Sequence, residues 1–148
     1  MAVREKYRGI APLPADWRDR LAELPSVCGR YGVDLLYLFG SAARVLEGDG
    51  IPEDLDLAYV AGPRSDFFGF AEALSRVLRS DRVDLVDLGA APPVFAFEVV
   101  RTGRLLYRRS VERENAFELS LTGRYRDEVV RLRRWAAWRA GGTRHGLS

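Results

Sequence analysis

The chain has 148 residues, a length typical of one domain, and 47% of them are hydrophobic, which is enough to form a core. Its 23 basic and 21 acidic side chains leave a net charge of +2. A charge this small does not make nucleic acid or an anionic membrane the expected partner.

Scarce residue types exclude further classes of protein. The single cysteine, Cys28, excludes an intrachain disulfide and a four-cysteine zinc site. The single histidine, His145, lies in a glycine-rich tail, where we do not expect the base of a serine or cysteine hydrolase. No segment approaches the roughly 18 continuous apolar residues of a membrane span, and the first residues do not open a signal-peptide core. We therefore expect a cytoplasmic protein.

The N-terminal part of the chain predicts an arm followed by two short helices. Residues 1–13 mix charge with glycine and proline without a clear period, so we expect a peripheral or poorly ordered arm. Residues 14–110 are expected to form the main domain. Its first helix opens at Pro14, because proline suits a first helical turn. A second helix ends at Gly32, because glycine tolerates the left-handed conformation that follows many helices.

The centre of the chain predicts two strands that bring polar groups together. A nearly continuous apolar run over residues 33–39 predicts a strand covered on both faces. It stops at Gly40 and Ser41, whose backbone N–H groups near a helix start favour phosphate. In the next strand Asp54 and Asp56 point to one face, because residues two apart on a strand do so. Paired carboxylates need a counter-charge, and hard oxygen ligands suit Mg²⁺.

A third strand, predicted over residues 82–88, carries two further aspartates on opposite faces. Asp84 is the better candidate for the active face, because its neighbours Val83 and Leu85 supply an apolar core face. Asp87 lies nearer the strand end, where it can reach solvent or cap the following turn. We therefore expect Asp84 to join the first two carboxylates.

The rest of the chain is predicted to be mainly helical. Residues 67–78 repeat apolar side chains at helical spacing and should pack on the sheet. A short helix is expected over 93–101 and a strand over 104–108. Residues 111–148 are expected to form a C-terminal helical segment, as one long helix or two, and a flexible tail that is too rich in glycine after Arg139 to stay helical.

The long helical segment carries more apolar side chains than one stripe requires. Leu119, Val130 and Trp138 fall away from the face that contains Phe117 and Leu121. Exposed apolar surface of this kind usually marks an interaction site. We therefore expect a protein partner to dock there.

The order of the motifs resembles the active-site signature of the polymerase β-type nucleotidyltransferases, which is a Gly-Ser turn, a spacer and an Asp-x-Asp pair. More narrowly, the chain resembles the minimal nucleotidyltransferase (MNT) group, which includes the MntA antitoxins. The spacer, residues 42–53, is slightly longer than usual in that group, and Val45 stands where the group usually has glycine. The resemblance implies an α/β fold with a short mixed β-sheet flanked by helices and a C-terminal helical segment.

The resemblance also implies a function, namely Mg²⁺-dependent transfer of AMP from a nucleoside triphosphate, ATP, to a hydroxyl group. The acceptor would be a tyrosine of a cognate HEPN ribonuclease toxin, in a type VII-like toxin–antitoxin pair. The catalytic and metal-binding residues would be Asp54, Asp56 and Asp84. The residues that bind the nucleotide phosphates would be Gly40, Ser41 and Arg44.

Two alternatives stay open. The chain could be an inactive module that neutralises its toxin by contact alone, which retained neutralisation after removal of the carboxylates would indicate. It could instead modify a small molecule such as an aminoglycoside, although the chain looks too short for the extra substrate domain that such enzymes usually carry. A homo-oligomer and a hetero-oligomer are both compatible with the sequence.

Overall fold

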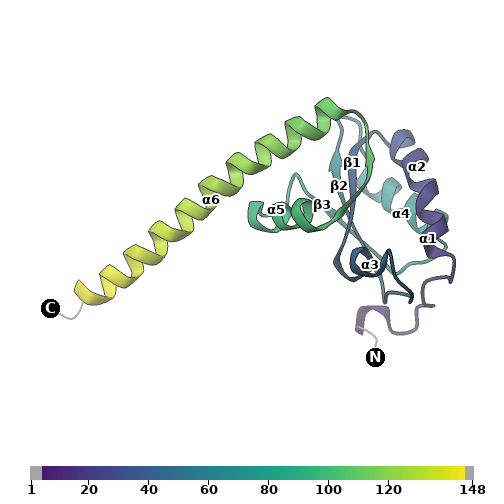
Figure 1. Cartoon of the computed structure of the whole chain (residues 1–148), viewed down its shortest axis with the longest axis horizontal. Helices are drawn as coiled ribbons and strands as arrows, with labels where there is room; N and C mark the ends of the chain where they lie inside the picture. The colour runs from purple at the N-terminus through teal and green to yellow at the C-terminus, as the bar shows by residue number, and fades with distance from the viewer. Residues whose placement is uncertain (1–4, 146–148) are drawn as a thin grey trace.

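Four strands form one open sheet, and helices cover both of its faces (Figure 1). The structure is a computed structural model that describes residues 5–145, and the side chains of residues 6–141. In chain order its elements are η1 (Glu5–Tyr7), α1 (Trp17–Arg20), η2 (Leu21–Glu23), α2 (Leu24–Arg30), β1 (Val33–Phe39), α3 (Gly40–Val45), β2 (Leu55–Ala61), α4 (Phe67–Leu78), β3 (Val83–Asp87), α5 (Pro93–Thr102), β4 (Arg104–Arg108) and α6 (Val111–His145).

The sheet is mixed, with the strand order β3-β2-β1-β4. Strand β1 runs antiparallel to both β2 and β4, whereas β2 and β3 are parallel. A parallel pair needs a crossover connection, and α4 provides it. Residues 33 to 38 of β1 are all buried, so the prediction of a strand covered on both faces is confirmed. The predicted short mixed sheet flanked by helices is confirmed as well.

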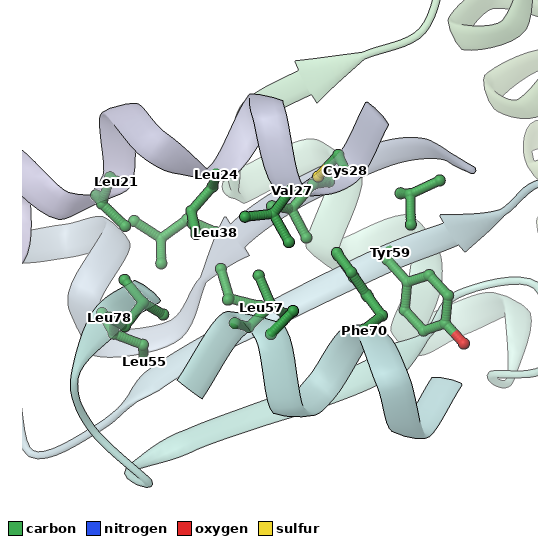
Figure 2. Close-up of a cluster of buried hydrophobic side chains, with 14 of the residues drawn as sticks. Leu21, Leu24, Val27, Cys28, Leu38, Leu55, Leu57, Tyr59, Phe70 and Leu78 are labelled. Carbon is green, nitrogen blue, oxygen red and sulfur yellow. The ribbon is translucent and has the colours of Figure 1, made fainter. Parts of the chain in front are cut away.

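Each face of the sheet has its own apolar cluster. The first cluster, between the sheet and α1, α2 and α4, includes Leu38, Leu57 and Phe70 (Figure 2). The second lies under α5 and the first part of α6 and includes Ala58 and Leu121. Neighbouring residues of one strand belong to different clusters because successive side chains point to opposite faces. The strands that hold the candidate site are therefore fixed from both sides.

Cys28 lies in the first cluster with no exposed surface, and burial raises the pKa of its thiol to about 12. Only the thiolate reacts readily with alkylating reagents. We therefore expect iodoacetamide to leave the native chain unlabelled at mildly alkaline pH and to label it fully after unfolding in guanidinium chloride. Intact mass measures both states, and labelling of the native chain at the rate of an unfolded peptide would contradict the burial.

Helix α6 has 35 residues, which corresponds to a length of about 50 Å. Its first part packs on the sheet and on α5, where the rings of Phe97 and Tyr125 stack with their centroids 4.0 Å apart. Residues 131–140 are exposed at every position, and the helix projects well beyond the sheet (Figure 1). None of the helices within residues 5–145 combines the length and apolar content that a bilayer crossing requires.

The expectation that the chain leaves the helix after Arg139 is wrong, because α6 continues through Gly141 to His145. Each glycine lowers helix stability by about 1 kcal/mol relative to alanine but keeps its backbone N–H, so the hydrogen bonds can continue. No proline follows Pro93 to remove one. The last part of the predicted flexible tail, residues 146–148, lies outside the described residues.

Candidate nucleotidyl-transfer site

Three carboxylates converge where β2 and β3 begin. Asp54 directly precedes β2, Asp56 lies within it, and Asp84 of β3 is the register partner of Asp56. One carboxylate oxygen from each lies within 4.8 Å of the others. Asp54 is only 1% exposed, whereas the other two are partly accessible. An all-oxygen donor set with three formal negative charges fits Mg²⁺, and the structure thus brings the three predicted residues together.

The carboxylates face the side of the sheet that carries α5 and α6. Leu57 belongs to the first apolar cluster and Ala58 to the second, so Asp56 shares the face of Ala58. The same alternation in β3 places Asp84 with Val86, which packs on the second cluster. A substrate would therefore reach the carboxylates from the side of α5 and α6.

The Gly-Ser turn lies directly against the carboxylates. Phe39, the last residue of β1, is the register partner of Asp56, and Gly40 follows with φ +70°. Residues other than glycine rarely adopt this φ. A Cβ at this position would overlap Oδ2 of Asp56. Glycine is therefore required both for the turn and for the close approach of the chain to the carboxylate.

The other two predicted phosphate-binding residues lie on α3, the short helix that starts at this turn. Ser41 is partly buried one residue into the helix, and Arg44 is exposed near its end. Both are therefore on the element that begins beside Asp56.

Asp87 lies apart from the three carboxylates. It is the last residue of β3, and its Oδ1 accepts a hydrogen bond of 2.9 Å from the backbone N–H of Gly89. Its pairing along the strand is with Tyr59 and not with Asp56. Of the two possibilities predicted for Asp87, reaching solvent or capping the following turn, the structure shows the second.

The N-terminal segment covers the carboxylates, whereas the composition of residues 1–13 predicted a peripheral or poorly ordered arm. The Lys6 ammonium forms an ion pair with Asp84. The Tyr7 hydroxyl donates a hydrogen bond of 3.1 Å to Oδ2 of Asp54, and Tyr7 is only 4% exposed. Burial and the nearby charges of Asp54 and Asp84 raise the pKa of the Tyr7 hydroxyl. Tyr7 therefore remains a neutral hydrogen-bond donor at the site.

Arg82 anchors this segment beside the site. Its buried guanidinium donates hydrogen bonds to the carbonyl oxygen of Ile10, 3.2 Å from Nε and 2.7 Å from Nη2, and to that of Glu53 at 3.4 Å. It also lies 5.7 Å from the centre of the Tyr7 ring, where a cation–π contact stabilises the pair. The only sequence signal for this arrangement is that Lys6 is the sole lysine among 23 basic residues.

Comparisons with known proteins agree with this geometry. Residues 23–112 match the family model described as polymerase beta, nucleotidyltransferase. No curated protein matches the chain.

Several solved structures share the fold. An MNT antitoxin in complex with a tri-AMPylated HEPN toxin from Shewanella oneidensis is 25% identical, with a TM-score of 0.59 over 82% of this chain and 94% of that one. The toxin–antitoxin complex MntA–HepT is also 25% identical, with a TM-score of 0.57 over 81% of this chain and 94% of that one. A toxin–antitoxin structure with AMP-PNP, at 22% identity, has a TM-score of 0.54 over 88% of this chain and 98% of that one.

The family model covers more than half of the chain, and the order of the Gly-Ser turn and the three carboxylates is the one that the sequence resemblance implied. The chain belongs to the polymerase β-type nucleotidyltransferase family.

Proposed function

We propose that this chain is an antitoxin that transfers AMP from ATP, with Mg²⁺, to a tyrosine hydroxyl of a HEPN-type toxin in the cytoplasm. The observation that carries the proposal is the convergence of Asp54, Asp56 and Asp84 within 4.8 Å, beside a Gly-Ser turn in a chain of this family. The similar MNT antitoxin, solved with a tri-AMPylated HEPN toxin, supports this choice of donor and partner.

The residues have distinct roles in this proposal. Asp54 and Asp56 would hold the metal, with Asp84 as a further ligand, and the metal would neutralise charge on the triphosphate and on the pyrophosphate leaving group. Asp84 orients the acceptor hydroxyl and takes its proton, a role that requires hydrogen-bond reach.

The nucleotide phosphates are held by the turn and the short helix α3 that follow β1. Gly40 and Ser41 hold the terminal phosphates through backbone N–H groups, and Arg44 supplies a positive charge from α3. Catalysis then consists of positioning and charge neutralisation, as in other phosphoryl-transfer enzymes.

The toxin is proposed to dock along α5 and α6. The exposed apolar side chains of α6 support this, above all Leu119, 77% exposed, and Trp138, 72% exposed. A groove between α5 and α6 is lined by Phe97 of α5 and by Val129 and Arg133 of α6, among others. Because the three carboxylates face the same side of the sheet, a partner on this surface can present a hydroxyl to them.

Co-expression with the small helical protein encoded beside this chain, followed by intact-mass measurement of that partner, tests the proposal. We expect one or more mass increments of AMP on the partner, and we expect the Asp54→Asn variant to produce none. Asp49→Asn, which alters an exposed loop carboxylate, is the matched control and should leave the modification unchanged.

The alternatives give different results in the same experiment. A stable complex whose partner is never modified would favour the inactive binding module. Transfer of AMP to an aminoglycoside, with the partner unmodified, would favour the small-molecule enzyme. Either result would overturn the proposed reaction.

A further inference from the structure

The N-terminal segment places a tyrosine hydroxyl among the three carboxylates. Tyr7 donates its hydrogen bond to Asp54, and Lys6 pairs with Asp84. The segment is held there by Arg82 through two hydrogen bonds to Ile10, and the Tyr7 side chain is almost fully buried. The proposed acceptor of AMP is also a tyrosine hydroxyl, so the chain carries within its own site the chemical group that it is proposed to modify.

We propose that Tyr7 is an acceptor in cis, so that the enzyme transfers AMP to its own N-terminal segment. The inference rests on the proposed function, because it uses the same ATP and the same carboxylates. It adds a modification site that the fold family does not define, since Tyr7 lies outside residues 23–112, which match the family model.

The transfer balances in atoms and charge. Tyr7 Oη forms a bond to the α-phosphorus of ATP. The bond between that phosphorus and the oxygen that bridges to the β-phosphate breaks, and pyrophosphate leaves with the electron pair. The phenolic proton passes to Asp84, so the hydroxyl changes its hydrogen-bond partner from Asp54 to Asp84. Asp84 is close enough for this change of partner, because one of its carboxylate oxygens lies within 4.8 Å of one of Asp54, to which Tyr7 now donates.

The other tyrosines offer a matched control. Tyr37 is also buried and also donates a hydrogen bond of 3.1 Å to a carboxylate, in this case Glu118 of α6. Burial is the main cause of its raised pKa, the charges that add to it are those of Glu118 and Glu114, and none of the three converging aspartates contributes. Both tyrosines are thus buried and hydrogen-bonded to a carboxylate, but of the two only Tyr7 contacts a carboxylate of the candidate site.

The first test incubates the purified full chain with ATP and Mg²⁺, together with the partner, and maps AMP by peptide mass spectrometry. We expect AMP on Tyr7 in the wild type and in Tyr37→Phe, and none on this segment in Tyr7→Phe. If the partner is modified while Tyr7 is not, the inference is wrong and the proposed function stands. If neither is modified, both are wrong.

A mixing experiment tests whether the transfer occurs within one chain. Wild type is incubated with a mass-tagged Asp54→Asn chain, which keeps Tyr7 as an acceptor but lacks one metal ligand. We expect AMP on Tyr7 of the wild type alone. Equal modification of the tagged chain would show transfer between chains and overturn the assignment in cis.

A readout independent of turnover is the hydrogen exchange of the Ile10 amide, which donates a hydrogen bond of 2.9 Å to the carbonyl oxygen of Tyr7, with Mg²⁺ and an ATP analogue that cannot transfer AMP. An acceptor in cis must stay beside the bound nucleotide, so we expect this amide to remain protected. Loss of its protection, to the level of an unfolded peptide, would mean that the nucleotide displaces the segment, and would overturn the inference even if the chain transfers AMP to its partner.

Discussion

Replacing Asp54 or Asp56 by asparagine is expected to abolish nucleotidyl transfer while the fold stays intact. Each change removes one charge from the three converging carboxylates, one oxygen of each lying within 4.8 Å of the others, and so removes a ligand from the metal that would neutralise the triphosphate. Asparagine keeps the shape of the side chain, and its amide oxygen can still accept the hydrogen bond that Tyr7 donates to Asp54. Transfer from labelled ATP measures the effect.

Thermal unfolding provides the control for these variants. Without ligand, their melting temperatures should be at or above that of the wild type, because repulsion between carboxylates is reduced. ATP with Mg²⁺ should stabilise the wild type by mass action, by about 2.7 kcal/mol at a hundredfold excess over the dissociation constant, and the variants much less. A double variant that transfers AMP at the wild-type rate would exclude a catalytic role for both residues.

Replacing Asp84 by alanine should lower activity about 10² to 10⁴-fold, the usual contribution of a positioned acid or base, whereas Asp87→Ala should change activity little. Asp84 pairs in register with Asp56, while Asp87 is bonded to the backbone of Gly89. Losing that hydrogen bond should reduce stability by about 1 kcal/mol, without reaching the site. Steady-state transfer rates and urea unfolding of both variants measure the two effects separately.

Lys6→Ala separates loss of the carboxylate from loss of its ion pair. Asp84→Ala also removes the ion pair with Lys6, and a partly exposed pair contributes little to stability. Lys6→Ala removes the same pair but keeps the carboxylate, and should therefore retain partner modification. Similar losses of activity in Asp84→Ala and Asp87→Ala would contradict the assignment, because they would mean that both carboxylates serve the reaction.

The sheet and the carboxylates could be predicted because their signals are local and periodic. The apolar run of β1 has the predicted bounds, residues 33–39, and β4 has its predicted bounds as well. Alternation along β3 separated Asp84 from Asp87, and the register of β2 and β3 bears out that separation. A period of two residues is enough to decide which face a side chain takes.

The packing of the N-terminal segment over the site could not be predicted, because its contacts join residues that are far apart in the chain. Lys6 and Asp84 are 78 positions apart, and Tyr7 and Asp54 are 47 apart. The arm has no apolar period, so its attachment depends on single contacts such as those of Arg82. The length of α6 was missed for another reason. Helix propensity predicted a stop among the glycines, yet propensity is a weak prior and these residues keep the helical hydrogen-bonding groups.

The outer part of α6 has a consequence for the lifetime of the free protein. From residue 131 to residue 140 every side chain is exposed, so this stretch gains no tertiary stabilisation, and an isolated helix of about a dozen residues is marginal in water. It therefore opens independently of the folded sheet, and proteases cleave such transiently open ends first. Arginines 131, 133, 134 and 139 make it a substrate for trypsin-like enzymes. A partner bound over Trp135 and Trp138 would keep this stretch helical and would slow its cleavage. The degradation rate of the chain would then depend on whether the partner is bound.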